Sequence, residues 1–106
     1  MRITDRDLEA VCARINVATS SPLLPWSPRD GGGMRANVGA YHLDYAYGGV
    51  TLHRMESEGG GISTPIGGGY RTKRELYGEM QAYLAGLAET ESRRESGLAQ
   101  RDEVTA

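Results

Sequence analysis

Residues 40–55 constrain the fold of this chain more than any other stretch, because apolar residues recur there at every second position. They lie on both sides of Gly48-Gly49 and are Tyr41, Leu43, Tyr45, Tyr47, Val50 and Leu52. A period of two is typical of a strand with one buried face, and adjacent glycines allow the positive φ angles of a tight turn. The sequence therefore predicts one β-hairpin.

The glycine pair also predicts how the two strands align. With Gly48 and Gly49 as the central turn residues, the pairs are Tyr47 with Val50, Tyr45 with Leu52, Leu43 with Arg54, Asp44 with His53, and His42 with Met55. The tyrosine and leucine face is the expected core face. The other face displays His42, Asp44, Thr51 and His53. A turn longer by one residue would shift this register.

A helix is predicted on each side of the hairpin. Thr4 and Asp7 are typical of a helix start and predict a helix over about residues 5–19, with the apolar stripe Leu8, Val11, Cys12, Ile15 and Ala18. Cys12 is expected to be a buried thiol rather than a nucleophile. Thr72 and Glu75 form a capping-box pattern that predicts a second helix over about residues 73–90. Its stripe, expected to pack on the hairpin, is Leu76, Met80, Tyr83, Leu84 and Leu87.

The remaining segments are rich in proline and glycine. The prolines of residues 22–28 predict irregular structure around Trp26, which we interpret as a hydrophobic plug or, alternatively, as a stacking platform for a ligand. Residues 62–66 are a candidate third strand, which Pro65 restricts to a sheet edge or a covering loop. The charged composition of residues 91–106 predicts a frayed or disordered tail.

Together these elements predict a single α+β domain over residues 1–90. It consists of an N-terminal helix, an antiparallel hairpin with a poor third strand, and a C-terminal helix packed on one sheet face. The net charge of −2 supplies no basic field for nucleic acid or an anionic membrane. One cysteine excludes an internal disulfide, and no apolar run is long enough to span a membrane. We expect a cytoplasmic protein.

The first candidate site joins a glycine run to the start of the second helix. Free N–H groups and the positive helix end favour an anion there, and nearby basic side chains reinforce this. The candidate ligand-binding residues are Gly67, Gly68, Gly69, Arg71, Thr72, Lys73 and Arg74. The alternative is a solvated turn capped by Glu75. No P-loop pattern is present, so nucleotide hydrolysis is not supported.

The second candidate is the polar face of the hairpin. His42, Asp44 and His53 have the chemistry of an acid–base pair or of metal ligands, but an exposed cross-strand ion pair would have the same residues. No nucleophile is placed beside them, so we expect no enzyme, no metal and no cofactor. With Trp26 and Tyr70 these three residues form a possible recognition surface, since the chain has six tyrosines and no phenylalanine.

Several of these motifs carry a resemblance. The chain resembles small uncharacterised proteins of tailed bacteriophages and prophages of proteobacteria over residues 37–87, and more loosely over residues 8–15. The segments that carry it are residues 41–49, 52–55, 59–61, 72–77 and 82–87. The resemblance implies a phage accessory protein in the cytoplasm of an infected bacterium. Such a protein would inhibit a host protein or defence system by binding.

A weaker resemblance is to the double-stranded RNA-binding domain, which also has a helix, three strands and a helix. Gly69, Lys73 and Arg74 match its basic second-helix start, whereas Pro65 and Glu75 depart from it. We therefore expect a non-catalytic protein that binds a host protein or sequesters a small phosphate-bearing anion. Nucleic-acid binding is the alternative, and a small His/Asp enzyme is the third. An exposed edge strand and surplus tyrosines also make a homodimer plausible.

Overall fold

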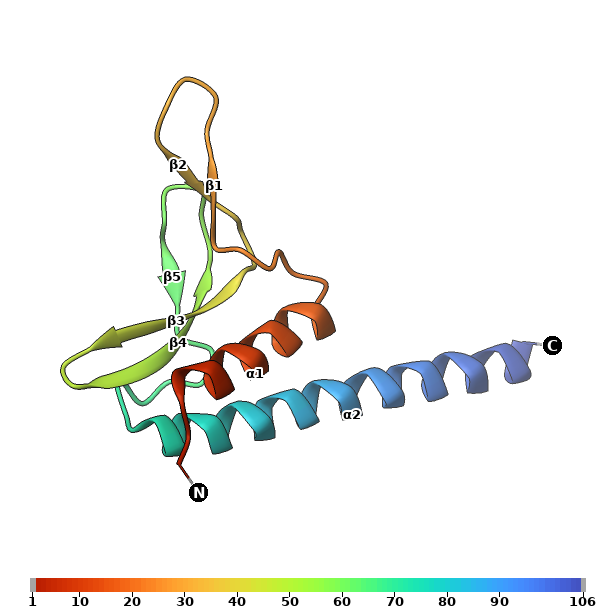
Figure 1. Cartoon of the computed structure of the whole chain (residues 1–106). Helices are drawn as coiled ribbons and strands as arrows, with labels where there is room; N and C mark the ends of the chain where they lie inside the picture. Colours follow the sequence, from red (N-terminus) through yellow and green to blue (C-terminus); the bar gives the residue numbers. More distant parts are fainter. Residues whose placement is uncertain (1, 106) are drawn as a thin grey trace.

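Two helices pack on one face of a three-stranded antiparallel sheet, and a separate two-stranded hairpin projects from this body (Figure 1). The computed structural model describes residues 2–105, with side chains described for residues 2–94. In chain order the elements are α1 (Asp5–Ala18), β1 (Trp26–Pro28), β2 (Met34–Ala36), β3 (Tyr41–Ala46), β4 (Gly49–Met55), β5 (Ile62–Ser63) and α2 (Lys73–Thr105). The predicted α+β class is confirmed.

The α1 helix begins as its sequence predicts. The Thr4 hydroxyl accepts a hydrogen bond from the Asp7 N–H at 3.2 Å, and the Asp7 carboxylate accepts one from the Thr4 N–H at 2.9 Å. The buried residues of the predicted stripe are Leu8, Val11, Cys12 and Ile15. Ala18 is exposed, however, and Asn16, which the sequence placed outside the stripe, is only 2% exposed.

β3 and β4 form the predicted hairpin, but the predicted register is wrong. The turn is centred on Tyr47 and Gly48, whose φ angles of 53° and 71° are those of a type I′ turn. The observed pairs are Tyr41 with Arg54, His42 with His53, Leu43 with Leu52, Asp44 with Thr51, Tyr45 with Val50, and Ala46 with Gly49. Each partner is shifted by an even number of residues, so every side chain stays on its predicted face.

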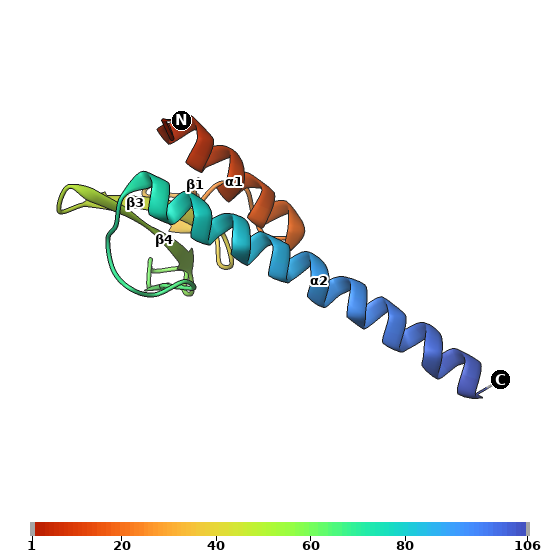
Figure 2. The ribbon, with the colours of Figure 1, turned by 90° about the horizontal axis from the view of Figure 1, so that it is seen from below.

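The α2 helix packs against both α1 and β4. The core lies between the helices and the hairpin and consists of Leu8, Val11, Cys12, Ile15, Tyr41, Val50, Leu52, Leu76 and Met80. α2 continues to Thr105 instead of ending near residue 90, and its C-terminal part extends past the rest of the chain (Figure 2). The boundary between a domain over residues 1–90 and a tail over 91–106 stays a prediction. Neither helix, over the described residues, is long and apolar enough to cross a membrane.

The prediction of irregular structure around the prolines is wrong, because β1 and β2 pair there as an antiparallel hairpin. The Arg29 N–H donates to the Gly33 carbonyl at 3.0 Å, and bonded pairs alternate along such a ladder. The next bonded pair is therefore Ser27 with Arg35, and the nitrogen of Pro28 faces away from β2. Proline is tolerated at that position because no ladder hydrogen bond is lost.

The third strand is short and lies at the sheet edge, as residues 62–66 predict. Only β5 pairs with the end of β4, and the chain then leaves the sheet through the glycine run of residues 67–69. It returns at Arg71, whose backbone exchanges hydrogen bonds of 2.9 and 3.0 Å with Val50. This return places the start of α2 beside the turn of the β3–β4 hairpin.

Candidate functional site

The predicted anion site contains an arginine that binds the chain itself. The Arg71 guanidinium donates to the Gly67 and Gly69 carbonyls, with 2.9 Å between Nε and the Gly69 oxygen, and it pairs with the Glu79 carboxylate. A Cβ at Gly68 would lie only 2.9 Å from Nη2 of Arg71. Two carbonyl oxygens of the glycine run are therefore bound by the Arg71 side chain.

Acidic partners also occupy the first turn of α2. The Glu75 carboxylate accepts hydrogen bonds from the Thr72 hydroxyl at 2.8 Å and the Thr72 N–H at 3.2 Å, and these bonds lower the pKa of Glu75. Lys73 pairs with Asp5 at 3.1 Å and lowers the pKa of that carboxyl. An anion would have to compete with these partners. Anion binding by residues 67–69 and 71–74, Arg74 included, stays a prediction.

A hollow of about 350 Å³ nevertheless lies between this junction and the hairpin turn. Its walls are formed by Tyr45, Ala46, Gly48, Gly49, Val50, Arg71, Thr72 and Lys73. The hollow is large enough for a small ligand, and one basic side chain that borders it, Lys73, is half-exposed.

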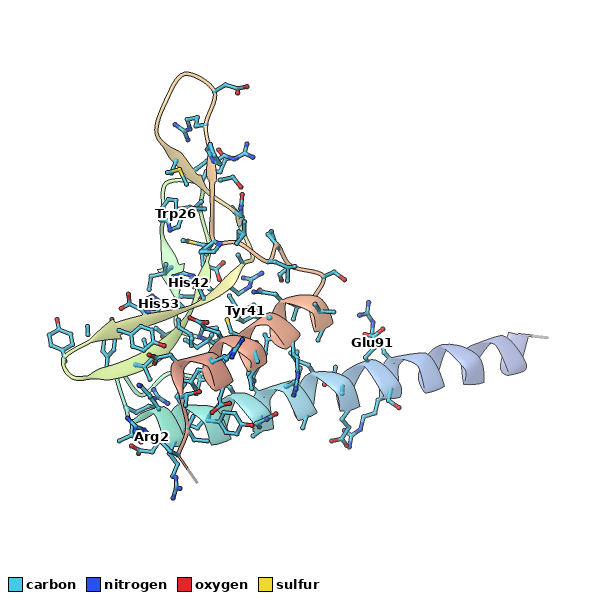
Figure 3. All side chains as sticks on the ribbon, in the orientation of Figure 1. Arg2, Trp26, Tyr41, His42, His53 and Glu91 are labelled. Carbon is cyan, nitrogen blue, oxygen red and sulfur yellow. The ribbon has the colours of Figure 1, made fainter. Side chains whose placement is uncertain are left out.

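The polar face of the hairpin brings its two histidines together. The rings of His42 and His53 meet edge to face, with centroids 5.5 Å apart (Figure 3). Asp44, by contrast, accepts a hydrogen bond from the Tyr70 hydroxyl. Burial and the nearby His53 ring lower the pKa of His42, whose Nδ1 is buried without a hydrogen-bond partner among the described residues. Within those residues, no three His, Cys, Asp or Glu side chains are grouped as metal ligands.

Trp26 lies apart from that face, on the β1–β2 hairpin (Figure 3). Trp26 is 40% exposed, and its ring rests on the turn before β5, where a Cβ at Gly60 would lie 3.0 Å from the ring. The predicted recognition residues are thus divided between Trp26 on the β1–β2 hairpin and a second group, which consists of His42 and Asp44 in β3, His53 in β4, and Tyr70 in the segment before α2. Their role in recognition stays a prediction.

The exposed residue that sequence reasoning missed is Tyr47, at the hairpin tip (residues 45–49). It is 92% exposed and holds a φ of 53°, a left-handed conformation that aromatic residues rarely adopt. Its ring meets the Tyr70 ring edge to face at 5.3 Å between centroids. The six tyrosines of the chain indicated that some would be exposed, but the predicted turn at Gly48-Gly49 placed Tyr47 inside the strand.

A second hollow, of about 450 Å³, runs between α1 and β3 and is called the β3 groove here. Its lining residues are Glu9, Cys12, Ala13, Asn16, Leu23, Leu24, Pro25, Tyr41, His42, Leu43 and Tyr45. Leu23 and Leu24 are 61% and 67% exposed. Burial raises the pKa of the Cys12 thiol to about 11, and its Sγ donates to the Tyr41 carbonyl at 3.3 Å, so little reactive thiolate is expected there.

No family model, curated protein or solved structure matches this chain.

Proposed function

We propose that this chain is a non-catalytic binding protein that recognises a partner protein through the hairpin tip and the neighbouring β3 groove. The observation that carries the proposal is Tyr47. A type I′ turn needs positive φ at both central residues, and Asn-Gly is the preferred pair. A bulky residue in that conformation costs about 1 kcal/mol, and strain of this kind clusters at binding sites.

Exposed apolar side chains extend this surface along the hairpin. Tyr45 is 48% exposed and borders both hollows, and the exposed Leu23 and Leu24 line the β3 groove. Aromatic residues are enriched in protein interfaces, where one end of the ring is buried and the hydroxyl stays wet. Adjoining exposed apolar residues on a small protein are typical of an interaction site.

The resemblance to phage proteins supports a setting for this activity. A small protein of that kind would act in the cytoplasm of an infected bacterium, by occupying a host protein or a component of a defence system.

The test is affinity capture from phage-infected bacteria with the wild-type protein and two variants. Tyr47→Asn keeps the turn and removes the ring, whereas Met34→Asn removes an exposed apolar side chain, 54% exposed, from the β1–β2 arm. We expect a partner protein that is captured by the wild type and by Met34→Asn, and lost with Tyr47→Asn. Capture of the same proteins by all three would contradict the proposal.

Sequestration of a small anionic ligand is the second candidate, favoured by the hollow beside Lys73. Native mass spectrometry of the purified protein, compared with its denatured mass, would detect a retained ligand. The candidate predicts a bound small molecule in the wild type that is lost in the Lys73→Ala/Arg74→Ala variant. A bare wild-type protein, or unchanged retention in the variant, would sink it.

A further inference from the structure

β3 is an edge strand of the three-stranded sheet. In an antiparallel pair, hydrogen-bonded and non-hydrogen-bonded residue pairs alternate, so the bonds of β4 show which backbone groups of β3 have no partner in the sheet. Val50 in β4 exchanges hydrogen bonds with Arg71, on the side of β4 away from β3. Tyr45, its pair in β3, therefore has its own N–H and C=O directed away from β4, and so do Leu43 and Tyr41.

The backbone groups of Tyr41 are not free, because a side chain of α1 binds them. The Asn16 amide donates to the Tyr41 carbonyl at 3.0 Å and accepts from the Tyr41 N–H at 2.7 Å, as a neighbouring strand residue would. No described residue does the same for Leu43 or Tyr45. The backbone N–H and C=O groups of Leu43 and Tyr45 are therefore available for hydrogen bonding, and both residues line the β3 groove.

We propose that the β3 groove binds an extended, basic segment of the partner protein as an added strand, paired with Leu43 and Tyr45. This inference rests on the proposed function and names the chemistry of the partner. Addition of a strand to a sheet edge is a recurring mode of peptide recognition, in which backbone hydrogen bonds give affinity and alternate side chains give specificity. Here α1 forms the second wall of the groove.

The charges beside the free edge specify a basic segment. Glu9 lines the groove on the α1 side and forms no ion pair with a described residue, and Asp44 lies between Leu43 and Tyr45 on the opposite face. A strand residue directly opposite Asp44 would place its side chain next to that carboxylate, where lysine or arginine is favoured. The flanking residues would face the apolar wall near Cys12 and Ala13.

The positions of Asp44 and Asn16 disfavour binding of the β3 strand of a second copy of this chain in the β3 groove. An antiparallel register that pairs Leu43 with Tyr45 of a second copy puts the two Asp44 carboxylates opposite each other, which is destabilising. The register that pairs Leu43 with itself needs the Tyr41 backbone groups, which Asn16 already binds. A strand from a different protein would bring no second Asp44 and would not need the Tyr41 backbone groups.

The probe is the peptide acetyl-Thr-Val-Lys-Val-Thr-amide, added to isotope-labelled protein and followed by NMR. We expect the largest amide shift changes at Leu43 and Tyr45, and no comparable change at Val50, whose N–H is already bonded. N-methylation of the two valines should abolish binding, because their N–H groups would face β3. N-methylation of the lysine should not, because its N–H would face away.

Matched variants complete the test. Ala13→Tyr fills the groove and should abolish binding, whereas Arg14→Tyr, which adds the same side chain to the next exposed position of α1, should not. Asp44→Asn should weaken binding of the lysine peptide by up to about fivefold. Shift changes centred on Lys73, or equal effects of the two N-methylated peptides, would overturn the inference.

Further outcomes distinguish a second copy of this chain from a partner strand, and the strand-addition inference from the proposed function. A dimer in sedimentation analysis that Ala13→Tyr dissociates would overturn the assignment of a heterologous strand. If the captured partner depends on Tyr47 but not on Ala13, the strand-addition inference fails while recognition of a partner protein through the hairpin tip stands. If capture depends on neither residue, both fail.

Discussion

At the scale of single residues, polar side chains inside the core explain what hydrophobic periodicity missed. Asn16 is buried because its amide satisfies both backbone groups of Tyr41, a contact between residues far apart in sequence. Periodicity ranks residues by apolarity, so it placed Asn16 on the outside of the helix. Cys12, by contrast, was predicted correctly because its apolar neighbours are in the same helix.

Asn16→Ala should destabilise the fold by about 2–3 kcal/mol. The substitution leaves the buried Tyr41 N–H without a partner and leaves its C=O with only the weak Cys12 thiol donor, and an unsatisfied buried group costs on the order of 1–3 kcal/mol. Urea unfolding measures the effect, with Arg14→Ala as the control on the exposed side of α1. Equal stability of the two variants would show that water replaces the amide at no cost.

Cys12 should resist alkylation in the folded protein. Burial raises its thiol pKa from 9.0 to about 11, so the thiolate is scarce at neutral pH. The neutral thiol also favours the folded state, and this contribution is present below pH 9 and is lost as the pH rises through about 11. Iodoacetamide labelling followed by mass spectrometry checks this, with urea-unfolded protein as the control. Equal labelling rates in the folded and unfolded protein would contradict it.

At the scale of elements, the hairpin shows why faces were predicted and register was not. The period of two defines the faces, but Tyr47-Gly48 and Gly48-Gly49 are both compatible with a two-residue turn. Gly49 has a different reason to be glycine: a Cβ there would lie 2.9 Å from the Arg71 carbonyl oxygen. Sequence alone holds no sign of that approach, because it comes from the isolated bridge that Arg71 forms with Val50 after the glycine run.

Gly49→Ala should therefore cost about 1–3 kcal/mol, the range for forcing extra atoms into a packed site. It would push Arg71 away from Val50 and disturb the start of α2. Gly59→Ala is the matched control, since a Cβ at Gly59 meets nothing within 4 Å. Thermal unfolding compares the two. A smaller loss at Gly49 than at Gly59 would show that the Arg71 contact is not tight.

At the scale of the whole molecule, five strands separate α1 from α2, because the β1–β2 hairpin precedes the sheet of β3, β4 and β5, whereas the RNA-binding domain that the sequence weakly resembles has three strands. The charges also differ from those of a nucleic-acid-binding surface. Lys73 and Arg71 pair with carboxylates, and the net charge is −2. We expect no salt-dependent binding to duplex RNA in fluorescence anisotropy at moderate salt. Binding that falls steeply with added salt and is lost in Lys73→Ala/Arg74→Ala would favour nucleic acid instead.

In the proposed function, Tyr47 is kept at the hairpin tip for recognition, at a cost in stability. The most direct measurement is the thermal stability of Tyr47→Asn together with its capture of the partner protein. The account predicts a variant that is more stable, by about 0.5–1 kcal/mol, because Asn-Gly suits a type I′ turn, and that no longer captures the partner. A variant that is less stable and still captures the partner would contradict it.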